Sequence, residues 1–374
     1  MILCRHVREL AEILSSLTSP RVFLVCGKTS FTSSGADLKL LPLLKGLEVT
    51  RFTDFTSNPN FEDAIKGAES FLASKSNLIL VIGGGSAIDI AKLIKVFSGI
   101  DRASIDLVGG VDPSPDCKVP IIAIPTTSGT GSEATHFAVI YKDKVKFSVA
   151  HPSLVPEFVI LDPELTRSMS PYLAASSGLD ALSQAMEAHW SVNSTLESRQ
   201  CSIRALEIAW AWLFEAVTNN GAEARKEMME ASFLAGKAIN IAKTTAPHAL
   251  SYSLTAHFGI SHGQAVGFFL PSFLSFNDNI CSEDCIDPRG SSFVSDRLEE
   301  IYRVIGVKDG EEAEKILSGF ILSLNLHTHF NDAGLDRSVV PIILNGVNEQ
   351  RLKNNPRSID SSQLSRLISN LVEH

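Results

Sequence analysis

The chain has 374 residues, of which 44% are hydrophobic and 20% charged, and its net charge is −9. This composition is typical of a folded globular protein with room for two domains, and it excludes a disordered chain. The acidic charge argues against nucleic acid or anionic membrane as the main partner, because both are bound through basic patches.

The cysteines and the apolar runs indicate in which compartment the protein is expected. Six cysteines are scattered without a regular framework, and no apolar run is long enough to span a membrane. No charged start followed by an apolar stretch marks a signal peptide. We therefore expect a cytoplasmic protein with free thiols. Cys281 and Cys285 lie four apart, but no second Cys/His pair follows at finger spacing, so a structural zinc site is not expected.

The first half of the chain alternates short β-branched runs with helical stretches. The expected strands and helices are, in chain order, 21–26, 35–46, 47–55, 60–75, 77–86, 87–99 and 119–125. This rhythm predicts a parallel sheet with helices on both faces. Beyond Asp162 and Pro163, long Ala/Leu/Glu segments take over and predict a helical domain. We place the boundary at residue 163, which gives an α/β domain over 1–163 and an all-α domain over 164–374.

Two glycine-rich loops follow strands of the expected sheet. In "LILVIGGGSAIDIAK", Gly83, Gly84 and Gly85 come directly after a strand and open a helix with Ser86. Such a turn lets backbone N–H groups approach a diphosphate at the positive end of a helix dipole. The spacing is not GxGxxG, so the turn alone could be a plain connection. The loop "IPTTSGTGSEAT" follows another strand, and two such loops in one parallel sheet favour a nucleotide.

The segment "GLDALSQAMEAHW" in the second half has the pattern of a metal-binding helix. Asp180 and Gln184 lie one turn apart on one face, whereas His189 falls on the opposite face. Glu187 shares the face of Asp180. It is either an acid that supports a ligand or a buried salt-bridge partner.

The segment "TTAPHALSYSLTAHFGISHG" adds two candidate ligands. His248 and His262 flank a short apolar helix that glycines interrupt. A single histidine on such a face is more often a core residue, and we interpret His257 that way. Together with Asp180 and Gln184, however, His248 and His262 can close a four-ligand site.

Taken together, "GGGSAIDIAK", "IPTTSGTGSEAT", "SGLDALSQAMEAHW" and "PHALSYSLTAHFGISHG" resemble the successive signatures of the iron-containing alcohol dehydrogenases, in the dehydroquinate-synthase-like superfamily. The resemblance implies an N-terminal dinucleotide-binding domain and a helical C-terminal domain. It implies NAD(P)-dependent interconversion of an alcohol and an aldehyde or ketone in a cleft between them. It also implies a divalent metal, usually iron or zinc, held by one Asp and three His, and a homodimer or larger assembly.

Carried across by motif, the metal positions are Asp180, Gln184, His248 and His262, and the sequence departs from the family at Gln184. An amide oxygen is harder and less basic than imidazole, so affinity should fall and preference should shift towards magnesium or manganese. Asp180, His248 and His262 still make a three-ligand set with open positions. Such a set suits a Lewis acid that binds a carbonyl, and we treat these three residues as the catalytic centre.

The resemblance also implies where the cofactor binds. The expected cofactor positions are Gly27, Lys28, Ser30, Gly83, Gly84, Gly85, Ser86, Asp89, Thr126, Thr127, Thr130 and Lys146. In the family, the residue after the first strand is often an Asp that bonds the adenosine ribose of NAD and repels the 2′-phosphate of NADP. Here Gly27 stands at that position and Lys28 follows it. We expect NADP to be accepted at least as well as NAD, unless the loop merely turns with Lys28 in solvent.

Over the longer stretch that contains these motifs, the sequence is most similar to the subgroup of this family that reduces phosphonoacetaldehyde to 2-hydroxyethylphosphonate. A doubly charged phosphonate needs cations or N–H donors, and the candidates are Lys146, His151, Lys243 and His136, of which the first three are ranked in that order. Lys146 also falls where the family places a cofactor-side lysine. Each of these residues could instead be a surface charge.

Three alternatives remain open at this point. One is a general short-chain alcohol dehydrogenase of the same family. Another is a phosphate lyase like dehydroquinate synthase, against which the missing Lys/Arg-rich phosphate pocket argues. The third is a nucleotide-binding protein whose metal site has decayed at Gln184. Retention of Asp180, His248 and His262 argues against decay.

Overall fold

The computed structural model of the protein describes residues 1–100, 118–143, 145–347 and 349–372. It divides into two compact units, Met1–Met169 and Ser170–His374. The division follows shortly after the boundary predicted at residue 163. None of the described helices has the length and hydropathy needed to cross a membrane.

The first unit is built on a six-stranded sheet, ordered β1-β8-β5-β4-β2-β3, in which every neighbouring pair is parallel. Its strands are β1 (Ile2–Cys4), β2 (Arg21–Cys26), β3 (Glu48–Phe52), β4 (Leu78–Gly83), β5 (Ile121–Pro125) and β8 (Phe158–Ile160). The Val/Ile/Leu-rich strands β4 and β5 are buried throughout, as a parallel sheet covered on both faces requires. The predicted parallel sheet is confirmed.

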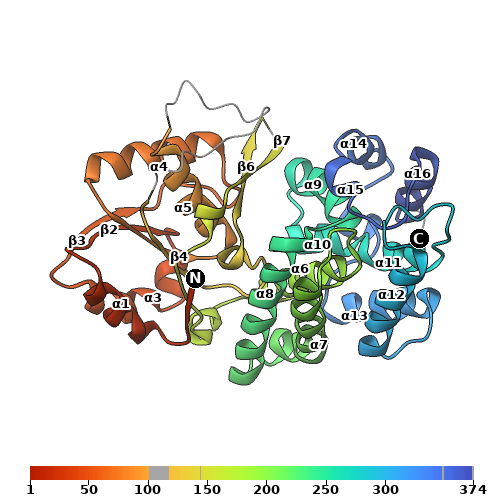
Figure 1. Ribbon diagram of the computed structural model, residues 1–374, viewed down its shortest axis with the longest axis horizontal. Coiled ribbons are helices and arrows are strands. Elements are labelled where there is room, and N and C mark those ends of the chain that lie inside the picture. Colours follow the sequence, from red (N-terminus) through yellow and green to blue (C-terminus); the bar gives the residue numbers. More distant parts are fainter. Residues whose placement is uncertain (101–117, 144, 348, 373–374) are drawn as a thin grey trace. The chain divides into compact units, whose positions relative to one another are not determined.

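Helices cover both faces of this sheet (Figure 1). Side chains alternate along a strand, so Phe23 and Val25 of β2 join one core cluster while Val22 and Leu24 join the other. The helices of the first cluster are α4 (Phe61–Ser74) and α5 (Gly85–Phe97). Those of the second include η1 (Val7–Glu9), α1 (Leu10–Ser16), α2 (Ser30–Ser33), α3 (Ala36–Leu40) and η2 (Leu41–Leu44).

The strand order creates a switch point between β2 and β4. From β2 the chain continues to β3 on one side, whereas β5 lies beyond β4 on the other. In open α/β sheets, ligands bind outside the carboxyl ends of the strands at such a point. Gly27 directly follows β2, and Gly84 directly follows β4. Two of the predicted cofactor loops therefore lie where this fold favours a ligand.

An antiparallel hairpin, β6 (Phe137–Lys142) and β7 (Val145–Ala150), lies outside the strands predicted from sequence. The fully buried Lys92 of α5 fixes the chain that leads into it. Its Nζ donates to the carbonyl oxygens of Ser132 (2.6 Å) and Thr135 (2.7 Å). Among the described residues of the unit, the remaining short helices are η4 (Ser132–Ala134), η5 (Pro152–Leu154) and η6 (Pro163–Thr166).

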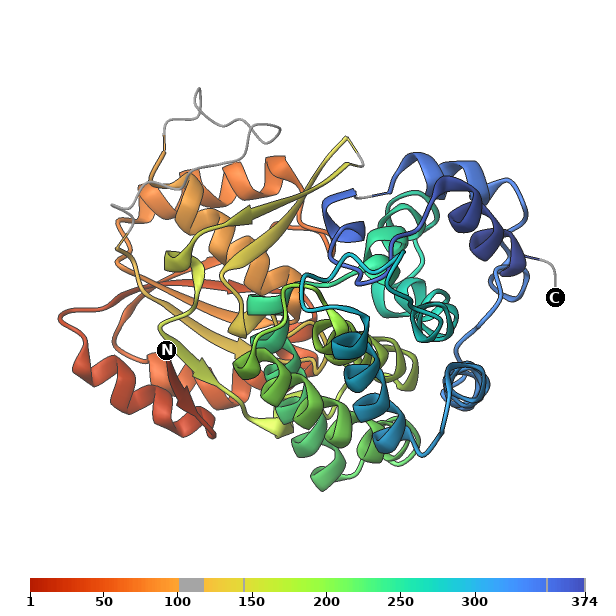
Figure 2. The same ribbon diagram turned by 45° about the vertical axis from the view of Figure 1, so that its right-hand side comes forward.

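The second unit is helical, as predicted. Its long helices are α6 (Pro171–Trp190), α7 (Leu196–Thr218) and α8 (Ala222–Ala242), which pack against one another and are drawn in green in Figure 2. The other helices are α9 (Ala246–Phe258), α10 (His262–Gly267), α11 (Leu270–Asp278), α12 (Ser291–Ile305), α13 (Gly310–Ser323), η7 (Asn331–Ala333), α14 (Val339–Asn345), α15 (Glu349–Leu352) and α16 (Ser361–Asn370).

Helix α6 forms the centre of this unit. Ser170 caps it by accepting a hydrogen bond from the amide of Leu173 at 3.2 Å, and Pro171 occupies the first turn, where no amide donor is needed. From Gly178 to Trp190 every residue of α6 is buried. Polar residues on such a helix require partners, and these partners define the candidate site.

Candidate metal and cofactor site

The two glycine-rich loops of the first unit contact each other at the start of α5. A Cβ at Gly84 would lie 3.0 Å from Thr127 Oγ1, and one at Gly85 would lie 2.6 Å from Thr130 Oγ1. Glycine at these positions lets both threonine hydroxyls approach the N-terminal turn of α5. The turn combines backbone N–H groups, the positive end of a helix dipole and hydroxyl donors, a combination that suits a diphosphate.

Asp89, a further predicted cofactor residue, holds these loops in place. Asp89 accepts hydrogen bonds from Ser132 Oγ at 2.5 Å and from the amide of Val139 at 3.0 Å. Burial raises the pKa of Asp89, which the positive charges of Lys92 and Lys146 oppose. Asp89 therefore ties α5 to the second loop and to the hairpin, and Lys146 lies near enough to act on its charge.

Other predicted cofactor residues lie at the loop ends. The amide of Thr126 donates to the carbonyl oxygen of Gly83 at 3.0 Å. The hydroxyl of Ser86 donates to the carbonyl oxygen of Ser57. The prediction that Ser86 opens the helix is wrong, because α5 begins at Gly85 with Gly84 as its cap.

The loop after β2 carries an exposed ion pair. Lys28 Nζ lies 3.3 Å from Asp54 Oδ1, and the side chains are 67% and 69% exposed. A Cβ at Gly27 would meet Ser30 Oγ at 2.2 Å, so a larger residue there requires the Ser30 side chain to rotate. Asp54 was missed from sequence, since it follows the neighbouring strand β3 rather than β2.

In the second unit, Asp180, His248 and His262 converge from three helices. His248 Nε2 lies 3.2 Å and His262 Nε2 4.0 Å from Asp180 Oδ1. One ligand atom from each residue lies within 4.8 Å of the other two. Asp180 and His248 are buried, while the side chain of His262 is 30% exposed. One carboxylate and two imidazoles with one side open are a donor set that fits a divalent transition metal.

Gln184 is buried one turn after Asp180, and its side chain hydrogen-bonds to the Asp180 carboxylate. Only the amide N–H can donate to that carboxylate. Burial opposes ionisation of Asp180, but the charge of His262, the His248 hydrogen bond and the Gln184 hydrogen bond together lower the pKa of Asp180. The structure thus gives Gln184 a contact to a candidate ligand, in addition to the ligand role considered from sequence.

Glu187 supports His248 from behind. It is fully buried and accepts hydrogen bonds from His248 Nδ1, from the amide of Thr245 at 2.6 Å and from Thr245 Oγ1 at 2.9 Å. Trp190 Nε1 donates to the same Thr245 hydroxyl at 2.9 Å. Of the two roles that sequence left open for Glu187, the contacts favour the acid that supports a ligand. Its partner Thr245 was missed from sequence.

The charge state of His248 follows from these contacts. Burial alone would lower the pKa of His248, but the carboxylates of Glu187 and Asp180 raise it to about 10. The metal-free site therefore holds a proton where a metal ligand requires a neutral nitrogen.

Gly263 explains how His262 reaches this cluster. A Cβ at Gly263 would lie 1.8 Å from the carbonyl oxygen of Ser176, inside α6. Only glycine allows the first turn of α10 to lie directly against α6 there, one residue after His262. The sequence shows the glycine in "ISHG", but it does not show that this glycine meets the backbone of α6.

Comparison with known proteins decides the family. Two family models match the chain, iron-containing alcohol dehydrogenase over residues 3–163 and the C-terminal domain of the Fe-containing alcohol dehydrogenase family over residues 174–372. The chain belongs to the iron-containing alcohol dehydrogenase family. It is thus an NAD(P)-dependent alcohol dehydrogenase or aldehyde reductase, in a family that implies a divalent metal.

Individual relatives resemble this dehydrogenase over its whole length. The phosphonoacetaldehyde reductase of Streptomyces viridochromogenes is 30% identical over 100% of this chain and 96% of the relative. The NADPH-dependent butanol dehydrogenase of Clostridium saccharobutylicum is 29% identical over 96% and 93%. The crystal structure of sulfoacetaldehyde reductase from Bifidobacterium kashiwanohense in complex with NAD+ superposes with a TM-score of 0.87 at 29% identity, covering 100% of this chain and 97% of that one.

The basic residues considered for the substrate divide between the units of the dehydrogenase. Lys146, His151 and His136 belong to the first unit, and Lys243 belongs to the second unit with the metal-ligand candidates. His151 caps η5, and its Nδ1 accepts from the amide of Ser153 at 3.2 Å. These contacts give His151 a structural role.

His257 does not belong to the core. It lies near the end of α9 with its side chain exposed, so its interpretation as a core histidine is wrong. The apolar pattern of the helix did not distinguish it from His248, which lies more than two turns earlier and is buried.

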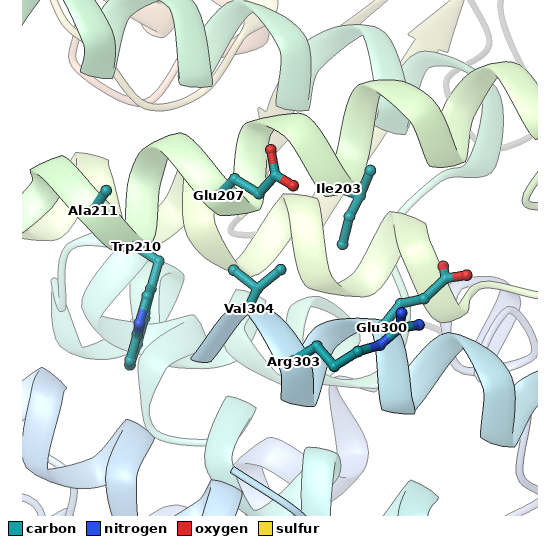
Figure 3. A pocket seen from close by; sticks show the side chains of 7 residues that line it. All are labelled: Ile203, Glu207, Trp210, Ala211, Glu300, Arg303 and Val304. Atoms are coloured by element: carbon teal, nitrogen blue, oxygen red, sulfur yellow. The ribbon is translucent and has the colours of Figure 1, made fainter. Parts of the chain in front are cut away.

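A groove between α7 and α12 of the dehydrogenase lies outside this ligand cluster (Figure 3). Its volume is about 450 Å³, and it is lined by Ile203, Glu207, Trp210, Ala211, Glu300, Arg303 and Val304. Glu300 accepts from His189 Nε2 at 2.7 Å, and Glu207 pairs with Arg204 at 3.0 Å. Glu300 thus has a partner on another helix and Glu207 has one on its own helix, and the groove adds no group to the candidate site.

Proposed function

We propose that this dehydrogenase reduces a small aldehyde that carries a phosphonate group, phosphonoacetaldehyde being the specific candidate. The observation that carries the proposal is the full-length similarity to a phosphonoacetaldehyde reductase. A solved relative is named for sulfoacetaldehyde, a two-carbon aldehyde that also carries an acidic oxyanion. The similarity to a butanol dehydrogenase supports the second candidate, a reductase of neutral short-chain aldehydes.

The proposed metal ligands are Asp180, His248 and His262, with Gln184 beside them. A bound divalent cation supplies a Lewis acid that stabilises negative charge on the substrate oxygen. The three side chains fix the position of that charge relative to the protein. We propose Fe²⁺ or Zn²⁺, held more weakly than by the family's set of one Asp and three His, because Gln184 offers an amide in place of imidazole.

Two other residues of the second unit, Glu187 and Thr245, orient the proposed ligand His248. Glu187 fixes the ring orientation of His248 through Nδ1 and leaves Nε2 towards Asp180. Thr245 fixes Glu187 in turn. In the reduction the carbonyl carbon gains a hydride and the oxygen gains a proton. The buried part of the site excludes water from one side, and the exposed edge of His262 leaves an approach for substrate.

For the cofactor, we propose that the cradle of Gly84, Gly85, Thr127 and Thr130 binds the diphosphate. NADPH should serve at least as well as NADH, because Gly27 presents no carboxylate to the 2′-phosphate. Lys28 pairs with Asp54 only in solvent, where an ion pair contributes at most about 1 kcal/mol. Lys28 can therefore turn to a phosphate at little cost.

The first experiment is anaerobic purification with metal analysis, beside a screen of NADH and NADPH oxidation over phosphonoacetaldehyde, acetaldehyde, propanal and lactaldehyde. The proposal expects a bound divalent metal and a preference for phosphonoacetaldehyde. A preference for the neutral aldehydes would instead select the general alcohol dehydrogenase. Homodimer formation and a cytoplasmic location stay predictions, the first to be measured by light scattering and the second by cell fractionation.

A further inference from the structure

Lys243 holds a backbone conformation that favours glycine. Its φ of 63° and ψ of 173° lie in a region that residues with a Cβ rarely adopt. It is half-buried and directly follows α8. Strain of this kind persists only where the surroundings over-determine it, and it concentrates at ligand sites. The Lys243 Nζ donates to the carbonyl oxygen of Asn240 at 3.3 Å, so the ammonium group lies beside the C-terminal end of α8.

The residues after Lys243 are tied to the proposed metal site. Thr245 donates its amide and its hydroxyl to Glu187, which also accepts from His248 Nδ1. Lys243 thus lies two residues before the contact that orients a proposed ligand. Its place in the chain is fixed relative to that ligand by buried hydrogen bonds.

A second cation lies close to Lys243. Arg351 belongs to α15, which packs against α9, the helix of His248. Just beyond α15, Asn354 Nδ2 donates to the carbonyl oxygen of Thr244 at 2.8 Å, which ties the two segments together. Burial and the charge of Arg351 lower the pKa of Lys243 to about 8. Two neighbouring cations partly withdrawn from water repel each other, and an anion between them relieves that repulsion.

We propose that Lys243 and Arg351 form the subsite for the oxyanion group of the substrate. This inference rests on the substrate class proposed above and names the residues that recognise it. A phosphonate dianion offers three oxygens, which can accept from an ammonium and a guanidinium together. A sulfonate offers three oxygens with a single charge, so two cations favour phosphonate. The assignment moves Lys243 ahead of Lys146 and His151.

The test compares Lys243→Gly and Arg351→Gln with a control, Lys226→Gln, as metal-loaded enzymes with the cofactor that the wild type uses. Lys226 lies on the same helix α8, exposed and paired with Glu223 at 2.8 Å. The measurements are kcat/KM for phosphonoacetaldehyde, sulfoacetaldehyde and propanal, and the inhibition constant of ethylphosphonate against propanal. Because glycine suits the backbone at position 243, Lys243→Gly should keep or raise the Tm, which separates loss of the cation from unfolding.

Lys243→Gly is expected to lower kcat/KM for phosphonoacetaldehyde at least about 30-fold relative to propanal, and to weaken ethylphosphonate inhibition by a similar factor. Sulfoacetaldehyde should be affected less. Arg351→Gln should act in the same direction by roughly 10-fold, because its guanidinium is one of the two oxyanion partners. Lys226→Gln should match the wild type.

The outcomes separate this inference from the function on which it rests. A wild-type preference for phosphonoacetaldehyde that survives both substitutions overturns the Lys243–Arg351 subsite and leaves the substrate class standing. A wild type without such a preference overturns the substrate class. In that case the subsite stands only if ethylphosphonate inhibits the wild type and fails to inhibit Lys243→Gly, and any other inhibition result overturns it as well.

Discussion

Replacing Glu187 by glutamine tests how the proposed metal site is held. One carboxylate oxygen of Glu187 accepts from His248, and the other accepts from the amide and hydroxyl of Thr245. Glutamine has nearly the same shape but places an NH₂ group at one of these two positions. Either His248 or Thr245 then faces a donor instead of an acceptor, and the negative charge behind the imidazole is lost.

The size of the effect follows from these contacts. A hydrogen bond to a charged group contributes about 1.5–3 kcal/mol, and removing the acid behind a metal-bound histidine typically lowers metal affinity about 10- to 100-fold. The proton on His248 works in the opposite direction. Its pKa of about 10 means that metal must displace a proton at neutral pH. Without the carboxylate of Glu187 the pKa of His248 falls, so proton competition lowers the metal affinity of the Glu187→Gln variant less than that of the wild type.

The two effects predict a difference that depends on pH. Wild-type affinity should rise about tenfold per pH unit from pH 7 towards 9, because His248 stays protonated up to its raised pKa. In Glu187→Gln the rise should be flatter, and its affinity at pH 9 should be about 10- to 100-fold below the wild type. The proton on His248 stabilises the metal-free fold fully below pH 6.5, its unperturbed pKa, and this stabilisation is lost as pH rises through about 10.

The assay is Zn²⁺ competition against a chelator of known affinity at pH 7, 8 and 9, together with the Tm of each metal-free protein. Glu300→Gln is the matched control, because Glu300 accepts from His189 in the same unit but outside the ligand cluster. Equal affinities for Glu187→Gln and wild type at pH 9, with parallel pH slopes and an intact fold, would refute the assigned role of Glu187.

Three further predictions concern single positions. Asp180→Ala or His262→Ala should reduce metal-dependent turnover below detection, and full activity of either variant, or of chelator-treated wild type, would show that these residues hold no catalytic metal. Gln184→His should tighten Zn²⁺ binding roughly 10-fold or more in the same competition assay, since imidazole is the better donor, and no tightening would place Gln184 away from the metal. Gly27→Asp should lower kcat/KM for NADPH roughly 10-fold or more while leaving NADH within about threefold, because the carboxylate repels only the 2′-phosphate. A wild type that uses NADH alone would contradict that assignment.

Local patterns were enough to predict the sheet and to place Asp180 and Gln184 on one face of a helix. The runs that became β2, β4 and β5 are apolar and β-branched, and the glycines after β4 mark the turn into α5. Asp180 and Gln184 share a face because helix geometry alone sets a four-residue spacing. These features depend only on residues that are close together in the sequence, so a single sequence is enough to predict them.

Features that depend on distant partners were not predictable in the same way. Apolar periodicity could not separate buried His248 from exposed His257, since both lie on one helix. The approach of His262 depends on Gly263 meeting the backbone of α6, a contact between segments far apart in sequence. The backbone conformation of Lys243 could not be predicted from residue propensities, because lysine rarely adopts a φ of 63°.

The most direct test of the proposed function is the ratio of kcat/KM for phosphonoacetaldehyde to that for propanal, measured with metal-loaded wild-type enzyme and one cofactor. An oxyanion held by cations should contribute about 2–4 kcal/mol to transition-state binding, so the expected ratio is roughly 30 to 1000. Treatment with a chelator should abolish both activities. Equal efficiencies for the charged and the neutral aldehyde would contradict the proposal and select a general alcohol dehydrogenase.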